Sequence, residues 1–320
     1  MPEPSRIALF LRSLDNDYQV LLKESFRMAA RLHQYSVREV SAGNDAQRQV
    51  AQIRECLAEP QVIRPRGLIV FPVMEVLLRP VAEEAARLGI AFVNLNRPWS
   101  YIEELRRQHS GVPLFTVMPD QKDIGRIQGR QFRWLLRKRR VLLYITGTPG
   151  TASAEHRLEG MQRELDDVDA EVVVERGDWS TASGASSIEQ WLRTRGASNA
   201  SKWVVAAQND SMAMGARSAL VDAAAGLKNP ELLDVPVTGC DGTPSYGLDL
   251  VKTGELAATV VVPPTTGRAV DELAQSFSTG RTPAADILLT VTSFPDLGDI
   301  GAAMRAGTKP LHARSGPHSK

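Results

Sequence analysis

The chain has 320 residues, 43% hydrophobic and 23% charged, which is the composition of a globular protein of about two domains. Its 38 Lys and Arg and 37 Asp and Glu give a formal net charge of +1, so charge provides no reason to expect nucleic acid or an anionic membrane as a partner. The two cysteines, Cys56 and Cys240, are too few for a disulfide framework or a four-thiolate zinc site. A nucleic-acid binder, a disulfide scaffold and a membrane protein are therefore poor hypotheses.

The N-terminal segment does not have the pattern of a secretory signal. Its apolar residues 7–11 are too few for a signal core of about 7–15 residues, and Arg12 and Asp15 interrupt them. No apolar run approaches the roughly 18–20 residues that span a bilayer. We expect a cytoplasmic location for the sequence as it stands, and a periplasmic one if the true start lies upstream.

In the first half of the chain, apolar strand-like segments alternate with amphipathic helical patterns. Asn44 and Asp45 can cap a helix that begins at residue 46. Apolar strands separated by helices are typical of a parallel sheet covered on both faces. The expected elements are a strand over 7–11, a helix over 18–33, a strand over 36–40, a helix over 46–57, a strand over 68–71, a helix over 76–88 and a strand over 90–95, after which the pattern breaks over 99–111.

The alternation then resumes and predicts a second unit of the same kind. Its expected elements are strands over 141–145, 171–174, 203–207 and 235–239, and helices over 154–165, 186–195 and 212–224. Two such units in series indicate two doubly wound α/β domains, with a ligand at the carboxyl ends of the strands. The polar C-terminal residues 301–320 are expected to form a disordered tail.

Two strand-to-helix turns of the second unit have distinctive sequences. Residues 207–216 are AQNDSMAMGA and residues 239–244 are GCDGTP, and a return strand over 254–260 (GELAATV) is followed by Pro263. On these motifs the chain resembles the ribose-class sugar-binding proteins of the type I periplasmic binding protein family. Lactose-repressor-like regulators use the same fold for their ligand-sensing core. The resemblance extends from about residue 6 to residue 295.

The resemblance implies two doubly wound, Rossmann-like parallel-sheet domains joined by a three-strand hinge. One lobe would comprise residues 1–118 and 263–288, and the other residues 119–262 and 289–300. The implied function is non-enzymatic binding of a sugar or polyol by closure of the two lobes about the hinge, with no cofactor and no metal.

A sugar site needs planar polar side chains around the hydroxyl groups and aromatic rings over the apolar C–H faces. Position by position, the resemblance implies ten ligand-binding residues of these types. They are Asn16, Tyr18, Gln19, Phe71, Asn96 and Arg97 in the first domain, and Arg157, Trp179, Asn209 and Asp241 in the second.

Several of these residues also have purely structural interpretations. Asn209 and Asp241 are suited to cap the helices that follow them. Arg157 can pair with a glutamate of its own helix, either Glu155 or Glu159. Trp179 and Phe71 can instead be core residues.

Four positions depart from the ribose-class pattern. Gln19 replaces an aromatic residue, Phe71 an asparagine, Asn96 a carboxylate and Val262 a hinge-side glutamine. The loss of a charge-assisted acceptor at residue 96 costs a ribose-like ligand about 1–3 kcal/mol. We therefore expect a less polar or differently substituted sugar, a deoxy sugar or a cyclic polyol rather than ribose.

Other candidate motifs lack part of what their chemistry needs. Residues 147–151 (GTPGT) lack the Lys-Ser/Thr of a P-loop and the third glycine of a dinucleotide site. The five histidines have no metal-ligand spacing, and no G-x-S-x-G elbow is present. The basic run at 137–140 (RKRR) is interpreted as a solvated helix end, where cations complement the helix dipole, rather than as a nucleic-acid patch.

Three roles remain for the binding event. The first is the solute receptor of an ABC-type sugar uptake system, with a membrane permease as partner. The alternative is a cytosolic sugar sensor that acts through a protein partner, and the last is a lyase or isomerase on the same scaffold. A DNA-binding regulator would need a helix-turn-helix of roughly 60 residues before the first strand, where only five residues stand. We expect a sugar-like solute as ligand, no nucleic acid and no insertion into the membrane.

Overall fold

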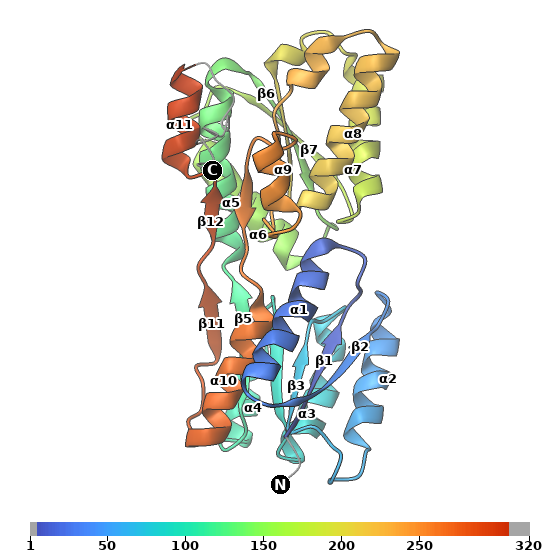
Figure 1. The fold of residues 1–320 in the computed structure, drawn as a ribbon, viewed down its shortest axis with the longest axis vertical. Helices are drawn as coiled ribbons and strands as arrows, with labels where there is room; N and C mark the ends of the chain where they lie inside the picture. The colour runs from blue at the N-terminus through green and yellow to red at the C-terminus, as the bar shows by residue number, and fades with distance from the viewer. Residues whose placement is uncertain (1–4, 307–320) are drawn as a thin grey trace, which may run out of the picture. The chain divides into compact units, whose positions relative to one another are not determined.

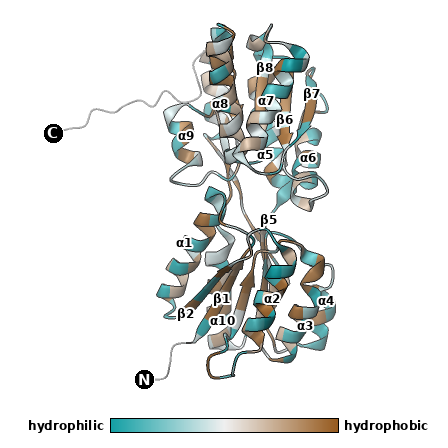
Figure 2. Cartoon of the chain, turned by 90° about the vertical axis from the view of Figure 1, so that its right-hand side faces the viewer, coloured by the Kyte–Doolittle hydropathy of each residue, from teal (hydrophilic) through white to brown (hydrophobic). Residues whose placement is uncertain are grey.

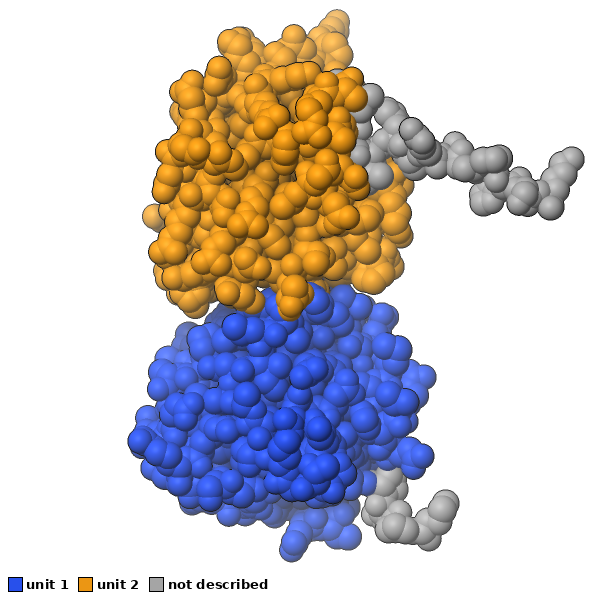
Figure 3. Space-filling model, turned by 90° about the vertical axis from the view of Figure 1, so that its left-hand side faces the viewer, with its two compact units in different colours: residues 1–119, 263–289 blue, residues 120–262, 290–320 orange. Residues whose placement is uncertain are grey.

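The computed structural model describes residues 5–306 of the chain (Figure 1). The chain divides into two compact units, coloured separately in Figure 3. Unit 1 comprises Met1–Pro119 and Pro263–Leu289, and unit 2 comprises Asp120–Val262 and Thr290–Lys320. Each unit therefore consists of two separate stretches of sequence, and the chain crosses from one unit to the other three times.

Unit 1 is built on a six-stranded parallel sheet with the order β11-β5-β4-β3-β1-β2. Its strands are β1 (Arg6–Leu11), β2 (Ser36–Ser41), β3 (Gly67–Val70), β4 (Ala91–Leu95), β5 (Leu114–Pro119) and β11 (Asp286–Leu289). Its helices are α1 (Asp17–Leu32), α2 (Ala46–Leu57), the 3-10 turn η1 (Glu75–Leu77), α3 (Arg79–Arg87), α4 (Ile102–Gln108) and α10 (Thr265–Thr279). Side chains of α2, α3 and α4 share one core with alternate residues of β1 and β3, while α10 packs against α1 and the sheet.

Unit 2 has a four-stranded parallel sheet with the order β7-β6-β8-β9, and a separate antiparallel pair β10-β12. Its strands are β6 (Val141–Thr146), β7 (Glu171–Arg176), β8 (Trp203–Ala207), β9 (Val237–Thr238), β10 (Thr259–Val261) and β12 (Thr292–Phe294). Its helices are α5 (Gln121–Leu135), η2 (Leu136–Lys138), α6 (Ala152–Leu165), α7 (Thr181–Arg195), η3 (Ala200–Lys202), α8 (Asp210–Gly226), η4 (Pro230–Asp234), α9 (Gly247–Thr253) and α11 (Leu297–Ala306). Helices α7 and α8 enclose one core of this sheet, and α5 and α6 enclose the other.

The central strands of both sheets are largely hydrophobic, whereas the edge strands β2 and β7 also carry polar residues (Figure 2). Strands β1, β3, β4 and β8 are buried along almost their whole length, as strands covered by helices on both faces must be. These observations confirm the predicted α/β class with parallel sheets. No helix within residues 5–306 is long and apolar enough to cross a membrane.

Two expectations about the chain's irregular parts were wrong. The predicted break over 99–111 contains the helix α4, whose buried Ile102 and Leu105 join the core of unit 1. The predicted tail over 301–320 is helical in its first six residues, because α11 continues to Ala306 and packs against α5. A Cβ at Gly301 would lie only 2.7 Å from the ring of Trp134, so this glycine permits the close packing. The rest of that predicted tail, 307–320, lies outside the described residues.

Candidate functional site

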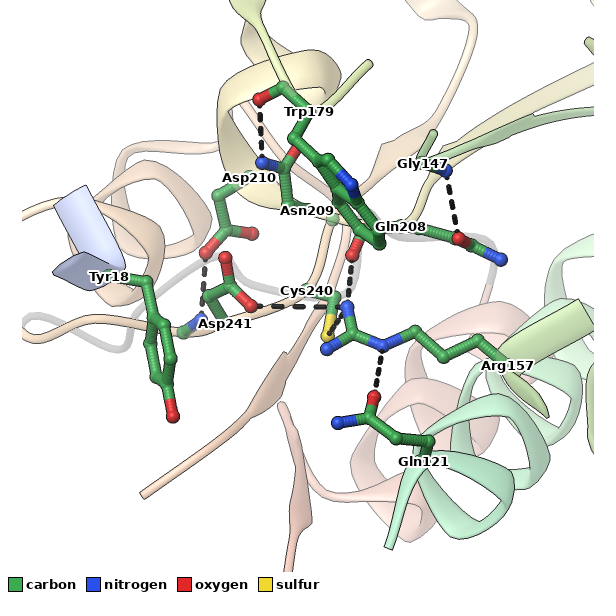
Figure 4. Close-up of polar contacts among 12 residues, drawn as sticks. Tyr18, Gln121, Gly147, Arg157, Trp179, Gln208, Asn209, Asp210, Cys240 and Asp241 are labelled. Atoms are coloured by element: carbon green, nitrogen blue, oxygen red, sulfur yellow. Dashed lines mark hydrogen bonds and ion pairs between the residues drawn. The ribbon is translucent and has the colours of Figure 1, made fainter. Parts of the chain in front are cut away.

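In unit 2, the loops at the carboxyl ends of the parallel strands bring four of the expected ligand residues together (Figure 4). Trp179 follows β7, Asn209 follows β8 and Asp241 follows β9, while Arg157 comes from α6. All except Trp179 are buried, and Arg157 and Asp241 are each only 6% exposed. Charged and amide side chains thus surround one aromatic ring at this edge of the sheet.

The guanidinium of Arg157 is held by contacts on several sides. Its Nε donates to Gln121 Oε1 at 2.8 Å, and its Nη1 donates to the carbonyl oxygen of Gln208. Nη1 also lies 4.0 Å from Asp241 Oδ1, and the guanidinium carbon lies 5.5 Å from the ring centroid of Trp179. These partners fix the orientation of a buried cation and offset part of its desolvation cost.

The alternative of a surface pair for Arg157 is wrong. Glu159 instead pairs with Lys122 at 2.9 Å and with Arg163 at 2.7 Å. Glu159 therefore belongs to the exposed face of α6, whereas Arg157 points into unit 2.

Asn209 has two structural roles in the same loop. Its Oδ1 accepts from the backbone N–H of Met212 at 2.9 Å, which caps α8 and confirms the capping interpretation for this residue. Its Nδ2 donates to the carbonyl oxygen of Trp179 at 2.9 Å. Trp179 in turn packs on the core of unit 2, so its ring is partly a core residue and partly exposed.

Three of the ten expected ligand residues have positive backbone φ angles, which non-glycine residues adopt rarely. These angles are +66° at Asn96, +75° at Trp179 and +105° at Asp241. Such conformations cost free energy, and they persist where the surrounding structure fixes them and cluster at functional sites. The Asp241 backbone is fixed by hydrogen bonds of 3.0 Å to Val260 and Val262 on either side of its own peptide.

Asp210 is a supporting residue that sequence reasoning did not single out. Its carboxylate is completely buried and accepts from the Gly242 backbone N–H and from Thr259 Oγ1, both at 2.7 Å. Gly239 and Gly247 pack against the same carboxylate, where an added Cβ would come within 2.1 Å and 2.0 Å of its oxygens. Asp210 thereby holds the loop that bears Asp241, and its place within the AQND motif was the available signal.

Gln208 joins the two central strands of unit 2 in a similar way. Its Oε1 accepts from the Gly147 backbone N–H at 2.9 Å, and its Nε2 donates to the Ala154 carbonyl oxygen at 2.9 Å. Gly147 leaves room for the ring of Trp179, because a Cβ on this residue would lie 1.9 Å from a ring atom. The first glycine of the 147–151 loop is thus explained by the packing of this ring and needs no phosphate.

In unit 1, six expected ligand residues follow the adjacent parallel strands β1, β3 and β4. Asn16 caps α1 by accepting from the Gln19 backbone N–H at 3.0 Å. Tyr18 donates its hydroxyl to the Pro263 carbonyl oxygen at 3.3 Å, and Asn96 Oδ1 accepts from Thr265 Oγ1 at 2.8 Å. The last two bonds attach the carboxyl edge of this sheet to the segment that leads into α10.

Gln19 is oriented by the loop after β1, whereas the backbone at Phe71 is held by a side chain of α2. Gln19 is buried, its Oε1 accepts from the Ser13 backbone N–H at 3.0 Å, and its Nε2 donates to Asp15 Oδ1 at 3.2 Å. Phe71 is 9% exposed, and its backbone carbonyl accepts from Gln49 Nε2 at 2.8 Å. Gln19 therefore shapes the loop after β1, and its ligand contact stays a prediction.

Arg97 and a residue missed by sequence reasoning, Arg12, place two cations at this edge. Burial lowers the pKa of Arg97 below its usual value, and the charge of Arg12 lowers it further, while Glu75 opposes the shift. Burial also lowers the pKa of Arg12. The signal for Arg12 was available, because a cation directly after the first apolar strand stands at the carboxyl end of a parallel sheet.

Within residues 5–306, no group of three or more His, Cys, Asp or Glu side chains is arranged to hold a metal ion. Cys56 and Cys240 are both free thiols with no exposed surface. Burial raises the pKa of each thiol, which disfavours the thiolate that a nucleophilic cysteine needs.

Comparison with known proteins agrees with this arrangement. The family profile described as "Periplasmic binding protein domain" matches residues 7–281. The ribose import binding protein RbsB of Haemophilus influenzae is 27% identical over 259 residues, which are 81% of this chain and 80% of that protein. A D-ribose/D-allose-binding protein of Pseudomonas aeruginosa is 28% identical over 222 residues, 68% of this chain and 67% of that protein.

A crystal structure shares the fold at lower sequence identity. It is an ABC transporter periplasmic solute binding protein from Actinobacillus succinogenes with bound D-allose. It aligns with a TM-score of 0.78 and 20% identity over 93% of this chain and 99% of that chain.

Proposed function

This chain belongs to the periplasmic binding protein family, as its motifs suggested, and we propose that it binds a sugar or polyol without catalysis, as the solute receptor of an ABC-type uptake system. The observation that best supports this proposal is the group formed in unit 2 by the buried Arg157, Asn209 and Asp241 and the partly exposed Trp179. Carboxylate, amide and guanidinium groups match the hydroxyl groups of a sugar, and an indole ring matches its C–H face. The two relatives, a ribose import binding protein and a D-ribose/D-allose-binding protein, support the same ligand class.

In this proposal the ligand is held by both units, which close on it by rotation about the three chain crossings. The ten residues expected from sequence are its contacts: Asn16, Tyr18, Gln19, Phe71, Asn96, Arg97, Arg157, Trp179, Asn209 and Asp241. Unit 1 would provide six of these contacts and unit 2 four, so affinity depends on closure. Closure also removes water from the polar contacts, which strengthens them.

The importer role requires a membrane permease as the protein partner, and the relative named as an import protein favours it over the cytosolic sensor. An enzyme on this scaffold is the least favoured role, because the clustered groups are those of a binding site. In this role the protein would act in the periplasm, the location that the name of its family gives.

Native mass spectrometry of the purified protein, followed by calorimetry with a panel of sugars and polyols, tests the proposal. The panel comprises pentoses, hexoses, deoxy sugars, inositols, and the aldonates, uronates and phosphates derived from the sugars. We expect a co-purified or titrated ligand that is recovered chemically unchanged.

Two aspartate variants make the test specific for the site. Asp241→Asn should weaken binding at least tenfold, because it removes a buried charge from the group. Asp249→Asn, on the exposed face of α9, should leave binding unchanged. Binding by none of the panel, turnover of the bound compound, or equal effects of the two variants would contradict the proposal.

A further inference from the structure

Two arginines stand at the carboxyl edge of the unit 1 sheet. Arg12 directly follows β1, and Arg97 is the second residue after β4. Strand β3 lies between these two strands, all three are parallel, and so their carboxyl ends meet at one edge. Phe71 and Asn96, two of the departures from the ribose-class pattern, lie at the same edge.

Arg97 lacks the partners that a buried guanidinium normally has. Its Nε is buried and makes no hydrogen bond to any residue within 5–306. Its guanidinium forms no ion pair within 4.0 Å in that part of the chain. Glu75, the acidic residue that acts on it electrostatically, likewise has a buried Oε1 without a hydrogen-bond partner, so the two groups do not neutralise each other by direct contact.

Arg12 is only partly satisfied. Its Nε donates to Asn44 Oδ1 at 3.0 Å, and its terminal amino groups make no hydrogen bond or ion pair within the described residues. The neighbouring Asp15 carboxylate instead accepts from Asn44 Nδ2 at 2.8 Å and from Gln19 at 3.2 Å. Asn44 therefore stands between this cation and the nearest carboxylate.

Two partly buried guanidiniums that repel each other, with Asp15 and Glu75 near them but no carboxylate in direct contact, destabilise unit 1 unless something else compensates them. Neutral hydroxyl groups compensate such a pair poorly, because they carry no charge. Carboxylate and phosphate groups compensate it well, since the planar guanidinium fork donates two parallel hydrogen bonds to either of them.

We infer that unit 1 holds the anionic group of an acidic sugar, a carboxylate or a phosphate, between Arg12 and Arg97. This inference rests on the proposed function and names its ligand class. It also gives Asn96 a reason to be uncharged, because a carboxylate next to Arg97 would compete with the anionic group of the ligand. The expected ligand is therefore an aldonate, a uronate or a sugar phosphate rather than the parent sugar.

Calorimetry with matched pairs tests the inference. The pairs are D-ribose with D-ribonate and with D-ribose 5-phosphate, and D-galactose with D-galactonate, with D-galacturonate and with D-galactose 6-phosphate. We expect at least one acid to bind tenfold or more tightly than its parent sugar. Comparison of the carboxylates with the phosphates identifies which of the two groups the site accepts.

Three arginine variants provide the controls. Arg12→Gln should lower the ratio of acid to neutral affinity at least tenfold, and Arg12→Lys should lower it less, because it keeps the charge and loses the fork. Arg87→Gln, an exposed arginine at the end of α3 near the start of β4, should keep the ratio of the wild type. Thermal unfolding of each variant checks that it is folded.

The outcomes separate the inference from the proposed function. A neutral sugar that binds as tightly as its acids, or an affinity ratio unchanged in Arg12→Gln, would overturn the inference and leave sugar binding in place. Binding of no sugar, neutral or acidic, would overturn both.

Discussion

The carboxyl edges of the two sheets differ in how their polar side chains are satisfied. In unit 2, Arg157 contacts Asp241 and the backbone carbonyl of Gln208, and Asn209 donates to the Trp179 carbonyl. The buried Asp210 carboxylate holds the loop of Asp241 through the Gly242 backbone N–H. In unit 1, by contrast, the polar side chains bond to their own loop or to the segment before α10, and Arg97 retains an unpartnered buried Nε. One edge is preorganised without a ligand, and the other is not.

Three of this chain's four departures from the ribose-class pattern, Gln19, Phe71 and Asn96, lie in unit 1. The fourth, Val262, is the last residue of unit 2 before the chain crosses, whereas Arg157, Trp179, Asn209 and Asp241 of unit 2 keep residue types suited to any sugar. Preorganised groups lower the cost of binding because they need no ordering when the ligand arrives. We therefore propose that unit 2 provides general affinity for a sugar and that unit 1 selects which sugar binds.

The largest effect is expected from removing Arg157, the cation at the carboxyl edge of the unit 2 sheet. Arg157→Ala removes hydrogen bonds to Gln121 and Gln208 and the cation beside Asp241 and Trp179. It also removes the hydrogen bonds that the guanidinium would donate to the ligand in the proposed site. Each charged hydrogen bond lost costs about 1.5–3 kcal/mol, so the loss of two such bonds should weaken binding of the tightest panel ligand at least a hundredfold. Calorimetry and the ligand-induced shift of the unfolding temperature measure this loss.

The matched variant is Arg163→Ala, which removes an exposed arginine of the same helix that pairs with Glu159. It should bind the ligand as the wild type does, because surface ion pairs contribute little. An unchanged ligand response in Arg157→Ala would show that unit 2 does not provide the affinity.

A smaller effect is expected from displacing the ring of Trp179 at the carboxyl edge of the unit 2 sheet. In Gly147→Ala the new methyl group would lie 1.9 Å from the Trp179 ring, so the ring must move away from the Arg157 guanidinium. The loss of ring contacts to a sugar and to the cation amounts to about 2 kcal/mol, or roughly thirtyfold in affinity. Calorimetry and near-ultraviolet circular dichroism of the indole report the change.

Gly226→Ala is the control, because a Cβ at this last residue of α8 meets no atom within 4 Å. It should bind normally and unfold at the same or a slightly higher temperature, since alanine is favoured over glycine in helices. If Gly147→Ala binds as tightly as this control, Trp179 is a core residue and not a ligand contact.

The sequence predicted the α/β class because apolar strands that alternate with helices leave few other arrangements. Asn209 and Asp241 lie within the two turn motifs, and Arg157 and Trp179 follow from the resemblance position by position. The structure brings all four together in unit 2, and their contact with a ligand stays a prediction. The sequence did not reveal the role of Asp210, whose function depends on the loop of Gly242 folding back onto it. Contacts between positions 32 residues apart have no local pattern, so only the folded chain shows them.

Unit 1 was predicted less completely for a related reason. Gln19 and Phe71 were recognised as departures, but the sequence did not show that Gln19 turns toward its own loop. Arg12 was missed because only the folded chain brings it to the same edge of the sheet as Arg97. Similarly, α11 was missed because its packing on Trp134 is set by a glycine in a weakly amphipathic segment.

The smallest effect is expected from substitutions at the carboxyl edge of the unit 1 sheet that change which sugar the protein prefers. Asn96 is buried, and its Oδ1 accepts from Thr265 Oγ1 at 2.8 Å, a bond that an aspartate at this position would keep. The side chain would then add acceptors and a negative charge beside Arg97, while Phe71→Asn restores a polar group after β3. The double variant Asn96→Asp with Phe71→Asn should bind D-ribose about tenfold more tightly than the wild type does, a gain of about 1.4 kcal/mol.

The same double variant should bind acidic sugars more weakly than the wild type does, which is the opposite of its effect on D-ribose. A carboxylate at position 96 supplies Arg97 with an internal counter-ion, so D-ribonate and D-ribose 5-phosphate should lose affinity in the same variant that gains it for D-ribose. Asn199→Asp is the control, because Asn199 has the same φ of +66° but is exposed in unit 2. Calorimetry measures the affinity of the wild type and of each variant for the three ligands. If the wild type binds D-ribose tightly, or if the affinities for neutral and acidic sugars change in the same direction, unit 1 does not select by charge.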